Sequence, residues 1–560
     1  MEIRALLRRP AVVAAVTLFL VVVSSVLYSM FYAAPAQADD DDGEFVNGEI
    51  VVKLKEGTDL TRFNLDYGTT TKDTFLGSAN IHLLQVTDGG DTEAKADAME
   101  SDPERVFYAE PNLTTDAPEG GARWRFRSDG DPIPSSDPAP YSGQYAVGAL
   151  NLECTRDINK GAGTVIAVLD TGAQPDHPEL SGSLTPGYDF IGDDANPAEE
   201  PNGLDDDGDT HVDEGTGHGT HVAGIVHLVA PEAKIMPLRV LDSDGMGNVF
   251  VIAEAVQYAV KNDADVINMS LGSSQDSELL EDVIEDLEAD DDADDDDADD
   301  DDGPVLEGVP PNGVVVAASA GNDNVETPQY PAAEDGVLAV TSVNQQEKKS
   351  EWANYGSWTS IAAPGEDVYS AFPTDRYASW NGTSMAAPFV AGQAALIRSV
   401  DPSLDAAAVR NTITGTARSL DAANPSYAGK LGAGHADAGA SMEKLRPGAG
   451  CGAPAVEPAN TKPIISDVSP AAGSATRDRT PTIKAKVRDA QTELRTGDIT
   501  LYVAGNQIRR TSFSYNVATD RLSYASNRLA RAKHRVTIIA RDAQGLVGSK
   551  TWSFGVRSKR

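Results

Sequence analysis

The central part of the chain, from about residue 142 to 446, alternates short apolar runs with stretches of helical periodicity. The apolar runs are Val165–Leu169, Val266–Met269, Val314–Ala318 and Gly336–Val340, and the helical patterns are His221–His227, Val249–Val260, Ser384–Ser399 and Leu404–Thr412. Short, fully apolar strands that alternate with helices form parallel sheets covered on both faces. We therefore expect an α/β domain whose functional site lies at the carboxyl ends of the strands.

Three polar motifs lie where these strands should end or these helices begin. They are Asp170-Thr171-Gly172, Gly217-His218-Gly219-Thr220-His221 and Asn381-Gly382-Thr383-Ser384. Each is ambiguous alone: Asp-Thr-Gly also opens aspartic-protease sites, which need a second copy, a His-x-x-His pair can ligate metal, and Gly-Thr-Ser can cap a helix. Together they supply an orienting acid, a base and a nucleophile, which is the set that acyl transfer needs.

The region from about 142 to 446 resembles the subtilisin-type serine proteases, the subtilase family, whose triad follows the same chain order. Val314–Asn322, Ile267–Gly272 and Ser360–Gly365 also match family segments in sequence order. The resemblance implies roles for four residues: Ser384 as nucleophile, His218 as general base, Asp170 as the acid that orients the imidazole, and Asn322 as the side-chain donor to the oxyanion. His221, one helical turn after His218, is expected to be structural. No catalytic cofactor is implied.

The resemblance also indicates where substrate binds. Ser270, Leu271 and Gly272 correspond to the strand that pairs with the substrate backbone, and Gly245 and Gly247 to the opposite edge of the cleft. Such backbone pairing favours extended polypeptide as the substrate. Asp323 follows Asn322 at the rim of the S1 pocket, where a carboxylate would favour a basic side chain.

One acidic loop offers hard oxygen ligands at alternate positions around a glycine turn. Its candidate calcium ligands are Asp205, Asp207, Asp209 and Asp213. The alternative is an acidic surface loop without a metal. The tight calcium site of the family is in doubt, because Leu228–Pro231 follows His221 without the loop that helps form it. Glu179, which matches a ligand position there, therefore lacks its expected partners.

The segments before and after the α/β region also show patterns of strands and helices. Residues 44–116 read as an α+β unit of ferredoxin-like type, with strands at Glu49–Leu54, Ile81–Val86 and Val106–Glu110 and helices near 60–67 and 93–99. This unit resembles a subtilase pro-domain, which implies an intramolecular chaperone and inhibitor. Residues 117–141 and 447–462 are expected to be linkers. Pro-domain cleavage is expected somewhere within 113–141, and nothing in the sequence identifies the bond.

Residues 463–556 show short alternating strands typical of a β-sandwich, and they resemble an immunoglobulin-like or fibronectin-like module. The module is basic: residues 461–560 carry 19 Lys+Arg and 7 Asp+Glu, whereas the whole chain of 560 residues has a net charge of −42. The acidic excess argues against a nucleic-acid partner. The basic module is expected to bind an anionic surface such as a cell wall, or to dock on the acidic catalytic domain.

Residues 276–303 are expected to be an acidic insertion. Eleven of the thirteen residues from Asp290 to Asp302 are aspartate, so charge repulsion favours an extended, solvated loop. Calcium buffering is the alternative use. Two cysteines, Cys154 and Cys451, either form one bridge or remain two thiols.

The first 38 residues are typical of an export signal. Arg4, Arg8 and Arg9 precede an uncharged stretch that ends in Ala36-Gln37-Ala38, an A-x-A cleavage pattern. The apolar stretch is also long enough to act as an uncleaved membrane anchor. The sequence thus predicts a secreted serine endopeptidase made as a self-processing precursor. The alternatives are a processing protease of narrow specificity, or a non-catalytic surface adhesin on a protease scaffold.

Overall fold

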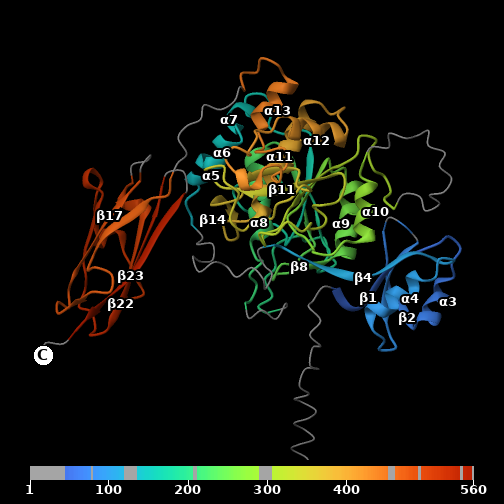
Figure 1. Cartoon of the computed structure of the whole chain (residues 1–560), viewed down its shortest axis with the longest axis horizontal. Helices are drawn as coiled ribbons and strands as arrows, with labels where there is room; N and C mark the ends of the chain where they lie inside the picture. Colours follow the sequence, from blue (N-terminus) through green and yellow to red (C-terminus); the bar gives the residue numbers. More distant parts are fainter. Residues whose placement is uncertain are drawn as a thin grey trace, which may run out of the picture. The chain divides into compact units, whose positions relative to one another are not determined.

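The computed structural model (Figure 1) describes residues 45–76, 78, 80–118, 135–205, 211–288, 305–451, 461–489, 494–542 and 546–557. The predicted export signal, the aspartate run at 290–302 and most of both predicted linkers lie outside these ranges. Among the described residues, no helix is long and apolar enough to cross a membrane.

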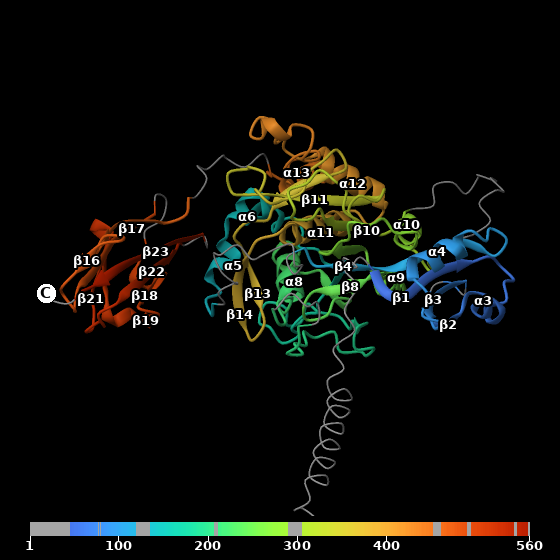
Figure 2. The same ribbon diagram turned by 60° about the horizontal axis from the view of Figure 1, so that its bottom comes forward.

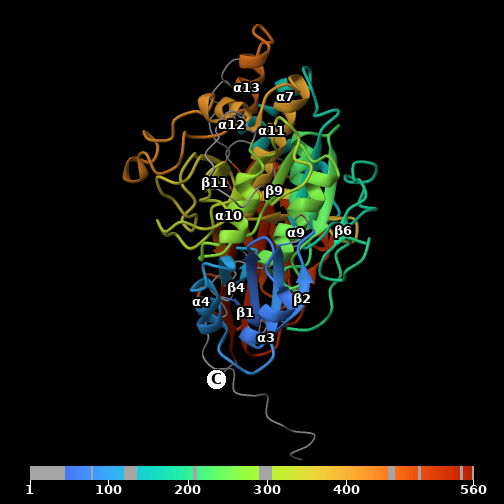
Figure 3. The ribbon, with the colours of Figure 1, turned by 90° about the vertical axis from the view of Figure 1, so that its right-hand side faces the viewer.

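The N-terminal unit is an antiparallel sheet with two helices on one face, as expected for an α+β pro-domain (Figures 1 and 3). Its strands, in sheet order, are β2 (Thr69–Thr74), β3 (Ile81–Val86), β1 (Phe45–Leu54) and β4 (Val106–Asp116), and its helices are α3 (Leu60–Tyr67) and α4 (Thr92–Glu100). Ile50 and Val52 of β1 pack under the helices against Phe63 and Met99. Val51, which points to the other face, packs in the core of the central domain. Strand β2 was missed by the sequence pattern, because its residues are mostly polar.

The central domain is built on a seven-stranded sheet whose strands run parallel, as the alternating pattern predicts. In sheet order the strands are β12 (Ile361–Pro364), β11 (Val337–Val343), β10 (Val315–Ser319), β9 (Val266–Met269), β5 (Val165–Asp170), β7 (Lys234–Arg239) and β6 (Tyr188–Asp189). The core strand β5 is buried on both faces: Ile166 and Val168 contact one layer of helices, and Ala167 and Leu169 contact the other. This two-sided burial explains the unbroken apolar run.

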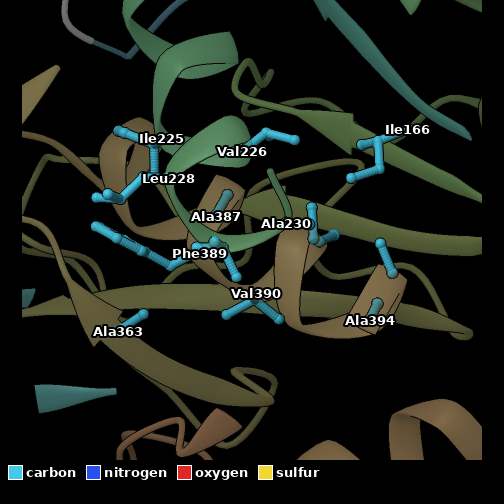
Figure 4. Close-up of a cluster of buried hydrophobic side chains, with 14 of the residues drawn as sticks. Ile166, Ile225, Val226, Leu228, Ala230, Ala363, Ala387, Phe389, Val390 and Ala394 are labelled. Carbon is cyan, nitrogen blue, oxygen red and sulfur yellow. The ribbon is translucent and has the colours of Figure 1, made fainter. Parts of the chain in front are cut away.

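Two helices on one face of this sheet carry the predicted histidine and serine motifs. Helices α8 (His218–Val229) and α11 (Thr383–Val400) pack against each other, and Figure 4 shows Ile225 and Val226 of α8 in one apolar cluster with Phe389 and Val390 of α11. Helices α9 (Val249–Lys261) and α10 (Glu278–Glu285) cover the opposite face. Both layers are almost fully buried, which holds the ends of the helices rigidly.

The remaining central elements surround this core. They are α5 (Ala139–Gly143), α6 (Tyr145–Ala149), α7 (Leu152–Thr155), α12 (Ala406–Gly415), the 3₁₀ turn Pro425–Tyr427, α13 (Ala438–Leu445), strand β8 (Met246–Asn248) and the hairpin of β13 (Val368–Phe372) and β14 (Arg376–Trp380). Figure 2 shows this hairpin.

Cys154 in α7 is bonded to Cys451, which follows α13, with the two Cα atoms 5.6 Å apart. The bridge therefore ties together the two ends of the catalytic region, and the two-thiol alternative is wrong.

The C-terminal module has two sheets that enclose their own core, which confirms the predicted β-sandwich. One sheet holds β15 (Ile464–Ser469), β17 (Thr482–Arg488), β21 (Arg521–Ala525) and β20 (Ser514–Asn516), and the other holds β16 (Ala475–Thr476), β23 (Val547–Val556), β22 (Lys533–Arg541), β18 (Ile499–Val503) and β19 (Asn506–Ile508). Three further 3₁₀ turns span Thr496–Asp498, Arg510–Ser512 and Val517–Thr519. Buried and exposed residues alternate along β17 and β22, as a strand with one solvated face requires.

Candidate active site

Asp170 is the last residue of β5, in the middle of the parallel sheet, and its side chain is fully buried. Its Oδ1 accepts hydrogen bonds from the Thr171 backbone N–H at 2.8 Å and from His218 Nδ1 at 2.7 Å. A buried carboxylate on Nδ1 fixes the imidazole tautomer and leaves Nε2 to act as a base. The structure thus joins two of the predicted residues, which are 48 positions apart in the sequence.

His218 is the first residue of α8 and is 1% exposed. The helix can begin this close to Asp170 because position 219 is glycine: a Cβ there would lie 2.0 Å from the carbonyl oxygen of Gly172. The edge of the Trp380 ring system stands against the imidazole, with centroids 5.5 Å apart. Helix start, Asp170 and Trp380 together hold the ring in one orientation.

Ser384 is the second residue of α11, so it lies at the positive end of that helix. Its Oγ lies 3.4 Å from the carbonyl oxygen of Ser270, and its own carbonyl accepts a 2.9 Å hydrogen bond from Ser270 Oγ. These contacts place the predicted nucleophile beside the predicted substrate-binding segment 270–272.

Asn322 follows strand β10 and is 2% exposed. Its Oδ1 accepts from the Thr383 backbone N–H at 3.0 Å and from Thr383 Oγ1 at 2.9 Å. Two donors on Oδ1 fix which way the amide is turned, so Nδ2 is its donor end. Asn322 is therefore tied to Thr383, the residue next to Ser384.

Comparison with known proteins identifies the family. The subtilase family model matches residues 161–436. Thermitase from Thermoactinomyces vulgaris is 36% identical over 296 residues, which cover 50% of this chain and 93% of thermitase. The chain belongs to the subtilase family. It is a serine endopeptidase, a hydrolase that acts on peptide bonds.

Two further relatives and a second family model extend this result. A thermophilic serine proteinase from Bacillus sp. (strain AK1) is 32% identical over 375 residues, covering 64% of this chain and 80% of that protein. Subtilisin DY from Bacillus licheniformis is 34% identical over 274 residues, covering 47% and 86%. Residues 32–112 match the fervidolysin N-terminal prodomain. The subtilase therefore carries a prodomain of the fervidolysin type.

The end of the prodomain occupies the predicted substrate cleft of the subtilase. Strand β4 pairs antiparallel with β8, with Thr115 opposite Gly247. Asp116 exchanges two backbone hydrogen bonds with Gly272, of 3.0 and 2.9 Å, and the Ala117 N–H donates to the Gly245 carbonyl at 2.9 Å. The predicted walls at 245–247 and 270–272 thus face each other across a bound extended chain.

Glu199, which no sequence motif indicates, holds the start of α8. Its carboxylate accepts from the Gly217 N–H at 2.5 Å, and from the backbone N–H and Oγ1 of Thr220, both at 2.9 Å. Burial raises the pKa of Glu199 to about 7, because the loss of solvation outweighs these three donors. Glu199 lies 18 residues before Gly217 in an irregular loop, so no local pattern pairs it with the helix.

His221 and Asp323 follow His218 and Asn322 closely in the chain. Nε2 of buried His221 lies 3.1 Å from the Ala378 carbonyl oxygen, and burial lowers the pKa of His221 to about 3. His221 is therefore neutral and packs from α8 against β14. Asp323 is exposed, and its backbone N–H donates to Asn354 Oδ1 at 2.9 Å.

The predicted calcium ligands lie only partly in the described structure. Asp207 and Asp209 fall within 206–210, outside the described residues, and Asp205 is exposed. Asp213 accepts backbone hydrogen bonds from Asn202 at 2.7 Å and Gly203 at 2.9 Å, which closes the loop on itself. No group of three or more His, Cys, Asp or Glu able to hold a metal occurs among the described residues.

Glu179, the residue at a calcium-ligand position of the family, has a different partner here. Its Oε1 accepts a 2.6 Å hydrogen bond from the Tyr377 hydroxyl. A tyrosine on the β13–β14 hairpin thus donates to this carboxylate. The loop after His221 that helps form the calcium site in the family is missing here.

Proposed function

We propose that this subtilase is a secreted, self-processing endopeptidase that cleaves extended polypeptide through an acyl-enzyme on Ser384. The observation that carries the proposal is the prodomain strand in the cleft, which pairs by its backbone with both walls. Ser270, Leu271 and Gly272 on one side, and Gly245 and Gly247 on the other, would pair with a substrate in the same way. Asp323 would favour a basic side chain at the S1 rim.

In the proposed reaction Ser384 Oγ attacks the scissile carbonyl carbon while His218 Nε2 takes its proton. Asp170 stabilises the imidazolium that forms. The carbonyl oxygen, now an oxyanion, accepts from Asn322 Nδ2 and from the Ser384 backbone N–H at the start of α11. His218 then gives the proton to the leaving amine, and water hydrolyses the ester by the reverse sequence.

A serine-directed phosphorylating reagent tests this assignment directly. Diisopropyl fluorophosphate should add one phosphoryl group per mature chain, and peptide mapping should place it on Ser384. His218→Ala should abolish the labelling, because the hydroxyl is then not deprotonated. Labelling of another serine, or equal labelling of both proteins, would refute the assigned nucleophile.

Replacing Asn322 by alanine should lower kcat about 10²–10³-fold with KM changed little, the loss that this donor's removal causes in subtilisin itself. The donor acts on the oxyanion, which exists only in the transition state. Thr383→Val removes one of the two donors that orient Asn322 and should cost only about three- to tenfold. Steady-state kinetics on one peptide would check both values, and an unchanged kcat for Asn322→Ala would contradict the role.

The prodomain is proposed to act as an intramolecular inhibitor whose release depends on pH through Glu110. This β4 carboxylate accepts from Ser277 Oγ at 2.8 Å and from the Glu278 and Leu279 N–H groups at the start of α10. Burial, aided by the charge of Glu278, raises the pKa of Glu110 to about 7. In a released prodomain the pKa returns to its usual value, so the complex takes up a proton between about pH 4.5 and 7.

Inhibition should therefore be strongest at low pH and weaken as the pH rises through 7. We expect prodomain release from the processed complex to be up to about 10²-fold faster at pH 8 than at pH 5, measured as the lag before peptide hydrolysis begins. Glu110→Gln should remove most of this difference, because the amide does not titrate. A lag with the same pH dependence in both proteins would exclude Glu110 as its source.

We also propose that the acidic loop at 202–213 binds calcium for stability. Its carboxylates are the hard oxygen donors that Ca²⁺ prefers, and Asp213 already closes the loop through Asn202 and Gly203. Calcium should raise the Tm of the mature enzyme by several degrees relative to the same enzyme in the presence of a chelator. Asp205→Asn should reduce the shift, and Asp157→Asn, an exposed carboxylate elsewhere, should not. An equal calcium shift in both variants would place the ion elsewhere.

For localisation we propose that residues 1–38 direct export and are removed after Ala38. Sequencing the amino terminus of precursor made with inactive Ser384→Ala tests this, since self-processing cannot then intervene. A chain that begins at Asp39 in the medium supports secretion, whereas an intact chain in the membrane fraction supports the anchor.

A further inference from the structure

The prodomain tail lies in the cleft in one defined register. Asp116 faces Gly272 as a hydrogen-bonded antiparallel pair, because each residue donates to the other's carbonyl. Thr115 and Ala117, on either side, bond to the opposite wall at Gly247 and Gly245. The tail is thus held from both sides, and it cannot slip by one residue without breaking all of these bonds.

This register identifies the residue that faces the nucleophile. In an antiparallel pair the next hydrogen-bonded pair lies two residues further along each strand, in opposite directions. Two residues after Asp116 is Pro118, and two residues before Gly272 is Ser270. Ser270 is the residue that contacts Ser384 twice, through its Oγ and through its carbonyl oxygen. Extended by one pair beyond the last observed pair, this register assigns the carbonyl of Pro118 to Ser384.

We propose that Pro118–Glu119 is the bond the precursor cleaves, and that Pro118 makes this cleavage slow. This inference rests on the proposed self-processing activity. Ser384 Oγ forms an ester with the Pro118 carbonyl carbon, and the bond to the Glu119 nitrogen breaks. The serine proton passes through His218 to that nitrogen, which leaves as the new amino terminus. Water then hydrolyses the ester and gives a prodomain that ends in the Pro118 carboxylate.

Proline slows this step because it has no backbone N–H. Any other residue facing Ser270 could donate an N–H to the Ser270 carbonyl, which would anchor the scissile carbonyl. With Pro118 in this position, the described contact of the Ser270 carbonyl oxygen is with Ser384 Oγ, 3.4 Å away. The released tail keeps its bonds to Gly272 and Gly245, so it stays in the cleft as an inhibitor after cleavage.

The test is a time course of intact mass on purified precursor of wild type, Pro118→Ala and Pro103→Ala. Pro103 is the matched control, an exposed prodomain proline remote from the cleft. The earliest wild-type products should be a prodomain ending at Pro118 and a chain beginning at Glu119. Pro118→Ala should process about tenfold faster, the rate equivalent of one hydrogen bond gained in the transition state, and Pro103→Ala should process at the wild-type rate.

The outcomes separate this inference from the function on which it rests. A first cut at another bond overturns the register assignment while leaving the protease in place. If the precursor is cut between Pro118 and Glu119 but Pro118→Ala is processed no faster than wild type, the proposed role of the proline is overturned. If wild type and Ser384→Ala both stay uncut and neither hydrolyses a peptide, the proposed function itself fails.

Discussion

Replacing Ser384 by alanine is expected to lower kcat for a peptide substrate about 10⁶-fold, the size of the loss that removing the nucleophile causes in subtilisin. The side chain lost is one hydroxyl in a fully buried position at the start of α11. The bond from Ser270 Oγ goes to the backbone carbonyl of Ser384 and survives the change. Activity should therefore disappear while the Tm of the protein stays close to that of the wild type.

The Ser384→Ala experiment needs a matched control and a second readout. Ser399→Ala, near the other end of α11, removes a hydroxyl that bonds to Asn159 and should leave kcat unchanged. Intact mass gives the second readout, since only the Ser384 variant should remain a full-length precursor. Residual hydrolysis within a hundredfold of wild type, in a folded Ser384→Ala protein free of other proteases, would show that another residue is the nucleophile.

Replacing Asp170 by asparagine should lower kcat about 10⁴-fold with little change in KM. The neutral amide cannot stabilise the imidazolium, and an N–H turned toward His218 Nδ1 would force the proton onto Nε2, where the base must accept. Both effects act at the single 2.7 Å contact between the two side chains. Because the charged partner of Asp170 is His218 itself, a residue of the same site, we expect the free energy of unfolding to change little.

Asp189→Asn is the control that separates catalysis from stability. Asp189 is also a buried aspartate at the end of a strand of the same sheet, but it pairs with Arg239 at 2.7 Å. Breaking this buried ion pair leaves Arg239 with the more distant Glu200 carboxylate at 3.8 Å, so this variant should lose about 3 kcal/mol of stability and keep its kcat. Steady-state kinetics and thermal unfolding of both proteins check the contrast. An Asp170→Asn enzyme within tenfold of wild type would contradict the assigned role.

Local patterns in the sequence were sufficient to predict the central fold and to propose the four catalytic positions. The apolar runs at Val165–Leu169 and Val266–Met269 are strands because both faces are buried, and burial on both faces leaves a signal that depends only on adjacent residues. The triad motifs were equally readable, since Asp170, His218 and Ser384 lie at points where strands end or helices begin. A turn or a helix start imposes local backbone demands that glycine and threonine reveal.

Tertiary structure decided everything that depends on pairing between distant segments. The carboxylate of Glu199 under α8, the hydroxyl of Tyr377 on Glu179, and the bridge from Cys154 to Cys451 join residues that no periodicity relates. The same holds for Pro118: the sequence left its cleavage bond open across 113–141, and the register of Asp116 against Gly272 selects one bond. Hydrogen-bond register between strands depends on which backbones meet in space, and a chain's local composition carries no record of that.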